Sequence, residues 1–160
     1  MTHIKAFALV LCLTILATPA LAWEAIVTSI KDGDSFIVQR TDTGQNVEIR
    51  LWGIDCPERN QRFGYAATQF GIEALLDQRV GIMEMYQDVY DRTVGATIIL
   101  ENGEVYQDLL MRAGLAWVDP RFCPDCRSWE AMQEGARLAG IGLWQDENPV
   151  PPWDWRRGVR

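Results

Sequence analysis

The stretch 47–58 holds the residues whose types and spacing point most directly to chemistry. Arg50, Asp55 and Glu58 fall within nine positions of one another. Carboxylates bind hard cations, and a guanidinium group donates a fork of hydrogen bonds to phosphate oxygens. The stretch therefore suits a metal ion bound next to a phosphate group. The alternative interpretation is a charged strand edge followed by a turn. Motifs in the rest of the chain distinguish this interpretation from a metal and phosphate site.

The local pattern around this stretch predicts how these side chains are placed. Apolar residues at 47, 49 and 51 alternate with polar residues at 48 and 50, which indicates a half-buried β-strand. Gly53 loosens the strand, and Pro57 ends it because proline has no N–H to donate to a sheet. The strand would therefore present Arg50 on its polar face and place Asp55 and Glu58 just past its end.

Periodicity over the rest of the chain predicts four further strands and three helices. The strands are expected over 23–30, 35–40, 80–86 and 93–100. The helices are expected over 62–77, 105–113 and 128–139, the last with Ser128 as its N-cap. The stretch 115–126 and the Pro-rich tail 149–157 are expected to be irregular, with the two tail tryptophans lying back on the body. Five strands and three helices suit a small closed barrel with helices packed against it, an α+β fold.

The first 22 residues have the pattern of a secretory signal peptide. A basic start with Lys5 precedes an apolar run over 6–18, and residues 20–22, Ala-Leu-Ala, form a small-x-small cleavage motif. The apolar run is too short for a permanent transmembrane helix, so we expect no stable membrane insertion. We expect one mature domain over 23–160, exported to the periplasm or secreted.

Removal of this segment would narrow the chemistry open to the protein. The only histidine, His3, would be lost, so proton transfer would depend on carboxylates, tyrosine, lysine or cysteine. The chain has 15 basic side chains, 14 without Lys5, against 22 acidic ones. An acidic surface argues against salt-driven coating of nucleic acid, which needs a basic stripe. A phosphate substrate would then have to be held by a few arginines and a cation.

Several motifs follow one another along the region after residue 22. The first two are 32–35, Asp-Gly-Asp-Ser, and 50–58, Arg-Leu-Trp-Gly-Ile-Asp-Cys-Pro-Glu. The segments 88–92, 114–116 and 142–144 complete the set. In this order the motifs resemble the staphylococcal nuclease family. An arginine, an aspartate and a Pro-Glu pair at this spacing after an Asp-Gly-Asp turn are specific together, although no single motif is.

The resemblance carries expectations about fold and activity. It implies a five-stranded OB-fold barrel with three packed helices. It also implies a Ca²⁺-dependent phosphodiesterase that hydrolyses single-stranded DNA, RNA or both and leaves 3′-phosphate ends. Nucleic acid would be its partner as substrate, and we expect a monomer.

Carried over position by position, the resemblance implies a cation site. Asp34 and Asp55 would bind Ca²⁺, and the main-chain carbonyl of Cys56 would be a further ligand. Oxygen ligands completed by water fit Ca²⁺ far better than Zn²⁺. The alternative is that these aspartates only stabilise turns through their own backbone.

The resemblance also implies the residues that act on the phosphate. Arg50 and Arg92 would hold the scissile phosphate, and Glu58 would act as, or orient, the general base for the attacking water. Arginines and a divalent cation stabilise the charge that develops on phosphate oxygens during hydrolysis. Arg92 could instead be a surface salt-bridge residue, and Glu58 could lie on a solvated loop.

Two aromatic residues are candidates for substrate binding. Tyr90 stands where the family places a phosphate-contacting tyrosine, and Trp117 where it places an aromatic side chain over a base. A tryptophan at such a position can equally serve packing. The chain departs from the family at Asp91, where glycine is usual, and at Val89, where a basic residue is usual. Both departures bear on efficiency and substrate preference.

The sequence Cys123-Pro124-Asp125-Cys126 supports three interpretations. In an exported protein, we favour a local structural disulfide between Cys123 and Cys126, with Cys56 as a free thiol. A zinc site would need a fourth ligand, since the mature chain would have three cysteines and no histidine. Redox chemistry would need the motif to open a helix after a strand. Pairing of Cys56 with either partner stays open.

Two main classes of function follow from the sequence. The first is an exported, Ca²⁺-dependent nuclease. The second is a non-catalytic OB-fold module that binds nucleic acid or a protein partner in the cell envelope. Degenerate domains of the family lose the acids and arginines that this chain retains, so the enzyme is favoured. An envelope protein that serves polysaccharide or assembly work is a third alternative.

Overall fold

The computed structural model describes residues 22–160. The predicted signal peptide therefore lies outside the described residues, apart from Ala22. No helix in the described range is long and apolar enough to cross a membrane.

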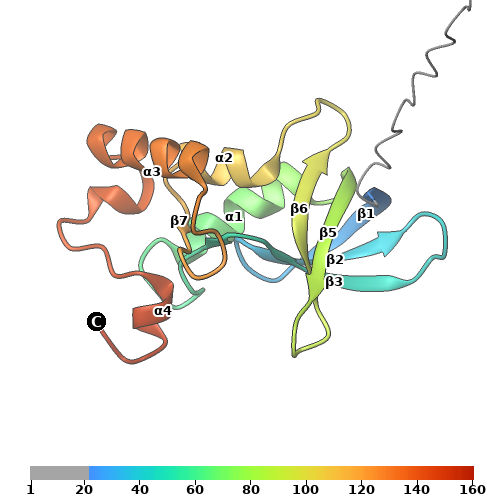
Figure 1. The fold of residues 1–160 in the computed structure, drawn as a ribbon, viewed down its shortest axis with the longest axis horizontal. Helices are drawn as coiled ribbons and strands as arrows, with labels where there is room; N and C mark the ends of the chain where they lie inside the picture. The colour runs from blue at the N-terminus through green and yellow to red at the C-terminus, as the bar shows by residue number, and fades with distance from the viewer. Residues whose placement is uncertain (1–21) are drawn as a thin grey trace, which may run out of the picture.

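Five strands form a closed barrel, as the sequence predicts, and their order in the barrel is β1-β2-β3-β6-β5. Neighbouring strands are antiparallel except for β3 and β6, which run parallel. Figure 1 shows the barrel beside the helices α1, α2 and α3. The strands are β1 (Ala22–Ile30), β2 (Ser35–Arg40), β3 (Asn46–Leu51), β5 (Arg79–Gln87) and β6 (Thr93–Ile99).

The barrel interior is filled by the apolar side chains that alternate along these strands. Val27, Val38, Ile49 and Ile82 come from four different strands and are fully buried. Side chains at alternate positions point to one face of a strand, so each strand contributes one row to the core. The intervening positions, including Arg50, are left for the outer face and the site.

Two helices pack against the barrel, a third packs on the second of these, and a fourth short helix lies in the tail. The first three correspond to the predicted helices. The fourth corrects the prediction of an irregular tail: Pro152 begins a helical turn, since its fixed φ suits the first position of a helix. The helices are α1 (Gly64–Leu75), α2 (Tyr106–Arg112), α3 (Arg127–Ala139) and α4 (Pro152–Trp155), with a 3₁₀ turn over Gly142–Gln145.

The N-terminus of α3 differs from its prediction. The helix begins at Arg127, one residue early, and Cys126 occupies the N-cap position without a side-chain capping bond. Ser128 therefore lies inside the first turn and does not cap the helix. The loop before α3 decides this, because its two cysteines are joined and fix where the chain can enter the helix.

A small two-stranded sheet outside the barrel was also not predicted. β4 (Ile54–Asp55) pairs antiparallel with β7 (Trp117–Val118). β7 lies within the stretch 115–126, which the sequence predicts to be irregular. The Asp119 N–H also donates to the Gly53 carbonyl at 2.9 Å. This ladder holds Asp55 in place after β3 ends.

The turn between β3 and β4 depends on Gly53. Its φ of +77° lies in the left-handed region, and a Cβ there would lie 2.7 Å from the Trp129 ring of α3. Trp129 also packs against Trp52, with ring centroids 5.7 Å apart. Helix α3 thus presses on the turn that carries the chain towards Asp55.

Candidate functional site

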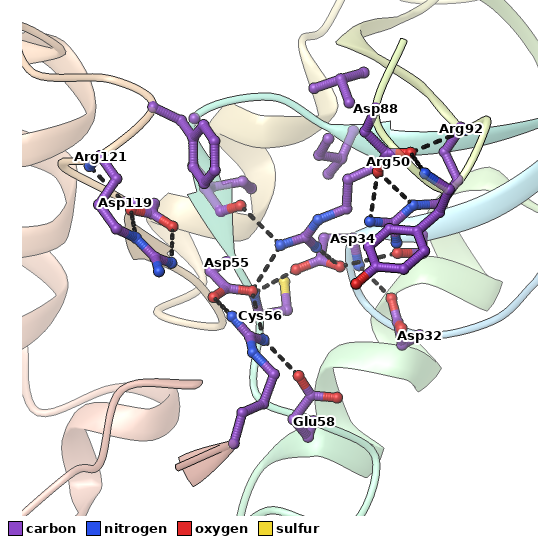
Figure 2. A pocket seen from close by; sticks show the side chains of 18 of the residues that line it. Asp32, Asp34, Arg50, Asp55, Cys56, Glu58, Asp88, Arg92, Asp119 and Arg121 are labelled. Carbon is purple, nitrogen blue, oxygen red and sulfur yellow. Dashed lines mark hydrogen bonds and ion pairs between the residues drawn. The ribbon is translucent and has the colours of Figure 1, made fainter. Parts of the chain in front are cut away.

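A pocket of about 750 Å³ opens where β3, β4 and the turns of the barrel meet. Figure 2 shows the acidic and basic side chains that point into it. The predicted site residues that line it are Asp34, Arg50, Asp55, Cys56, Glu58, Tyr90 and Arg92. Trp117 is the one predicted site residue of the nuclease assignment that does not.

Asp34 and Arg50 are brought together by strand register. Ser35 on β2 pairs with Arg50 on β3, and the Leu51 N–H donates to the Asp34 carbonyl at 2.9 Å. The Asp34 carboxylate forms an ion pair with Arg50 Nη1, and it accepts a hydrogen bond of 2.5 Å from the Cys56 N–H. Asp34 therefore links the first hairpin turn to the chain just past β4.

Arg50 also contacts the second aspartate. Its Nη2 lies 2.6 Å from Asp55 Oδ1, so one guanidinium bridges the two carboxylates. Asp34 is 3% exposed and Asp55 is 1% exposed. Two buried carboxylates this close need positive charge nearby, because burial without a partner disfavours the ionised form. Arg50 supplies part of that charge.

A second arginine, Arg156, approaches the site from the C-terminal tail. Its Nη2 lies 2.7 Å from Asp55 Oδ2, and its Nη1 lies 2.5 Å from Glu58 Oε1. Burial lowers the pKa of Arg156, but hydrogen bonds to the two carboxylates outweigh burial and leave the pKa above its ordinary value. Arg156 is therefore a permanent positive charge in the site, and nothing in its local sequence indicates this role.

The tail that carries Arg156 is fastened to the loop after Glu58. Gln61 Nε2 donates to the Val150 carbonyl at 2.6 Å. Trp155 Nε1 donates to Asn60 Oδ1 at 3.3 Å. The tail tryptophans thus lie back on the body, as the sequence predicts.

Arg92 lies at the start of β6, next to the strand that carries Arg50. Asp88 holds it with carboxylate contacts of 2.8 Å to Nε and 2.7 Å to Nη2. Burial raises the pKa of Asp88, but its hydrogen bonds with Arg92 and the charge of Arg92 leave the pKa below its ordinary value. In the view of Figure 2, Arg92 and Glu58 lie on opposite sides of Arg50.

Asp91, next to Arg92, has a backbone conformation that glycine adopts more easily. Its φ is +62°, in the left-handed region. This gives a physical reason to expect glycine at such a position, since only glycine is free of strain there. Aspartate tolerates the conformation better than most residues.

The two aromatic candidates are placed differently. Tyr90 is exposed on the β5–β6 hairpin, and the Arg92 guanidinium lies 5.4 Å from its ring centroid. Trp117 packs against Trp144 and Trp153, at centroid distances of 4.4 and 6.1 Å. Its backbone pairs with that of Asp55, but its side chain lines a separate cavity of about 260 Å³ and not the main pocket.

Three further residues that the sequence reasoning missed line the main pocket. Asp119 is buried and accepts hydrogen bonds from Arg121 at 2.9 and 2.5 Å. Burial raises the pKa of Asp119, but the hydrogen bonds with Arg121 leave the pKa below its ordinary value. Phe122 lies beside them with an exposed ring. Only the clustering of an acid, an arginine and an aromatic residue in an otherwise irregular stretch could have pointed to them.

The cysteines pair locally. Cys123 and Cys126 form a disulfide with Cα atoms 5.5 Å apart, and Cys56 is a buried free thiol. A Cβ on Gly53 would lie 3.1 Å from the Cys123 Cβ, so the disulfide loop rests on the β3–β4 turn. The disulfide loop therefore packs against the turn that leads to Asp55.

The donor atoms at the centre fit a hard cation better than a soft one. Asp34 and Asp55 offer only oxygens. Burial raises the pKa of the Cys56 thiol well above its ordinary value, so the thiol stays neutral and is a poor soft ligand. Within residues 22–160, no three histidine, cysteine or acidic side chains converge closely enough to hold a metal by themselves. Carbonyl and water oxygens would have to complete the coordination.

The sequence of this chain is similar to those of known proteins. A family model described as staphylococcal nuclease homologue matches residues 48–146. An uncharacterized endonuclease of Escherichia coli is 35% identical over 81% of this chain and 82% of its own length. A micrococcal nuclease of Shigella flexneri is 32% identical over 91% of this chain and 88% of its own length.

A longer relative shares the same region. An uncharacterized 38.1 kDa protein of Capnoides sempervirens is 38% identical over 70% of this chain, and the chain spans 32% of that protein. The region that the family model matches contains Arg50, Asp55, Glu58 and Arg92, and it begins after β1 and β2. From the family match and the similarity to relatives of comparable length, the chain belongs to the staphylococcal nuclease family.

Proposed function

We propose that this chain is a Ca²⁺-dependent nuclease that hydrolyses single-stranded DNA, RNA or both and leaves 3′-phosphate ends. Membership of the staphylococcal nuclease family supports hydrolase activity on nucleic acid. The observation that carries the proposal is the convergence of Asp34, Asp55 and Glu58 with Arg50 and Arg92 in one pocket.

Arg50 and Arg92 are suited to hold the scissile phosphate. Arg50 lies on β3, and Arg92 immediately precedes the adjacent parallel strand β6, in which Thr93 pairs with Ile49. Asp88 fixes the Arg92 guanidinium in direction, so little side-chain freedom is lost when a phosphate binds. Donors fixed in this way stabilise the charge that develops in the transition state.

Glu58 is suited to take the proton of the attacking water. It lines the same pocket as Asp34 and Asp55, the two aspartates that would bind the cation, and Arg156 holds its carboxylate at 2.5 Å. The main-chain carbonyl of Cys56 would be the third protein ligand. Bound Ca²⁺ would supply positive charge for the phosphate and lower the pKa of a water molecule.

Hydrolysis of a labelled single-stranded DNA, with Ca²⁺ or with excess EDTA, tests the proposal. We expect cleavage only with Ca²⁺, and 3′-phosphate ends that resist extension until a phosphatase removes them. Glu58→Gln should lower turnover by about a hundredfold, as loss of a general base does, without a change in Tm. Glu48→Gln is a matched control, because Glu48 pairs with Lys31 outside the pocket. Undiminished cleavage in EDTA contradicts the calcium assignment, and binding without cleavage would indicate the non-catalytic module.

We also propose that the protein is exported. The signal-peptide pattern of residues 1–22 supports this. The Cys123–Cys126 pair supports it as well, since disulfides persist in oxidising compartments. Expression with the native leader, followed by fractionation and N-terminal sequencing, should find mature protein outside the cytoplasm that begins near Trp23. Full-length protein retained in the cytoplasm would contradict the proposal.

A further inference from the structure

Arg156 lies against Asp55, where a cation would bind, and it also pairs with Glu58. Both Asp55 oxygens accept hydrogen bonds from arginine: Oδ1 from Arg50 and Arg156, and Oδ2 from Arg156. Glu58 is paired with the same Arg156 guanidinium. A divalent cation on Asp55 would lie beside two guanidinium charges, so its binding is opposed until at least one of these arginine contacts gives way.

Arg156 is the more easily displaced of the two arginines. Its side chain is 44% exposed, whereas that of Arg50 is 18% exposed. Arg50 stands on a barrel strand with partners on both sides, and Arg156 follows a four-residue helix near the chain end. Exposed side chains exchange partners at lower cost, since water can solvate the released charge.

The charges around Asp55 and Glu58 explain why the Arg156 guanidinium is favourable there. Four carboxylates line this part of the pocket, those of Asp32, Asp34, Asp55 and Glu58, and Arg50 pairs with only two of them. Like charges repel one another, which pushes the carboxylates apart. The Arg156 guanidinium offsets this repulsion and holds the Asp55 and Glu58 carboxylates towards the same space.

We propose that Arg156 is an exchangeable counter-ion of the cation site: its guanidinium pairs with Asp55 and Glu58 when the site is free of metal and leaves them when a divalent cation binds. The proposal rests on the proposed function, because it takes Asp55 as a cation ligand. It assigns Arg156 a positioning role for the acids, and it couples the C-terminal tail to the metal.

Calcium titration by calorimetry on the full mature protein tests this exchange. Arg156→Gln removes the competing charge, so we expect Ca²⁺ to bind about threefold to tenfold more tightly than to the wild type. Arg157→Gln is the matched control: it removes the same charge one residue away, where the arginine pairs with Asp154. This control should change the affinity by less than about twofold, because its charge is solvent-screened. Unchanged or weaker Ca²⁺ binding by Arg156→Gln overturns the proposal.

A second measurement follows the release of Arg156 itself. In the Arg157→Gln protein, trypsin can cut the tail after Arg156, and the ion pairs with Asp55 and Glu58 should hinder it. We expect Ca²⁺ to raise the rate of this cleavage at least about twofold, normalised to trypsin activity on a small chromogenic peptide and followed by mass spectrometry. A rate that does not change with Ca²⁺ overturns the exchange, even if the affinity changes.

Two further outcomes separate the proposals. If Arg156→Gln does not fold, Arg156→Lys replaces it: one ammonium cannot bridge both carboxylates as the guanidinium fork does, so Ca²⁺ affinity should still rise above that of the wild type. A lysine variant with wild-type affinity overturns the proposal.

A wild-type protein that binds no Ca²⁺ overturns the calcium assignment as well. Normal wild-type binding with no effect of either Arg156 variant overturns only the counter-ion role.

Discussion

Gly64→Ala should disturb the position of Glu58 without touching its side chain. A Cβ at Gly64 would lie 1.7 Å from the Glu58 carbonyl oxygen and 3.0 Å from the Arg59 Cα. Because carbon and oxygen atoms that are not bonded stay more than about 3 Å apart, the loop and the start of α1 must separate by about 1–1.5 Å. The Glu58 carbonyl also accepts the Gln61 N–H at 2.8 Å, so that turn shifts as well.

The size of the effect follows from this displacement. Overpacking of a tight contact costs about 1–3 kcal/mol of unfolding free energy, which lowers Tm by about 4–10 °C in a domain of this length. A misplacement of about 1 Å near the reacting groups lowers turnover on the order of tenfold to a hundredfold. We expect both changes, measured by thermal melting and by cleavage of single-stranded DNA with saturating Ca²⁺.

A second glycine provides the control. Gly135 lies inside α3, and a Cβ there meets nothing within 4 Å. Gly135→Ala should raise the unfolding free energy by about 0.5–1 kcal/mol through helix propensity and leave turnover unchanged. Normal turnover in a destabilised Gly64→Ala protein would refute the reasoning, because Glu58 could then move without consequence and would not be the base.

Three other predictions concern the walls of the pocket. Asp91→Gly should raise the unfolding free energy by about 0.5–1 kcal/mol in urea, since glycine removes the strain of the left-handed φ; a lower value would contradict the strain. The Asp119 carboxyl, whose pKa is lowered by Arg121, stabilises the fold above its ordinary pKa, and this stabilisation is lost as pH falls through the lowered value. Asp119→Asn should therefore lose less Tm between about pH 4 and pH 2 than the wild type, and equal acid slopes would exclude this contribution. Reduction of Cys123–Cys126 should cost only about 1–2 kcal/mol because the loop is short, yet raise KM for single-stranded DNA; an unchanged KM would show that the loop does not shape the site.

The local parts of the fold could be predicted because their causes are local. Alternation along 47–51 indicates β3, and the Asp-Gly turn after β1 indicates a hairpin, so the placement of Asp34 beside Arg50 follows from neighbouring strands. The helices follow from three- and four-residue spacing of apolar side chains. The element bounds shifted by one or two residues, and the start of α3 moved because of a disulfide loop that periodicity does not register.

The two glycines of α1 contact different parts of the molecule. Gly64 and Gly71 lower the helix propensity of α1, and close packing against the sheet would explain both residues. Gly71 does meet the Ile30 side chain of β1 and the Tyr106 hydroxyl of α2. Gly64 instead meets the backbone of the Glu58 loop. Only the path of that loop, which the sequence does not determine, shows that this glycine sets the position of a site residue.

The sequence by itself determined the barrel strands, the main helices and the short motifs that place most of the candidate site residues near β3. These depend on interactions between residues close in the chain or on adjacent strands. The tertiary structure alone decided the rest. Arg156 meets Asp55 from 101 positions away, β7 pairs with β4, and Trp117 turns to Trp144 and Trp153. Such contacts leave no periodicity in the sequence, because they arise where packing of the helices and tail brings distant segments onto the same pocket wall.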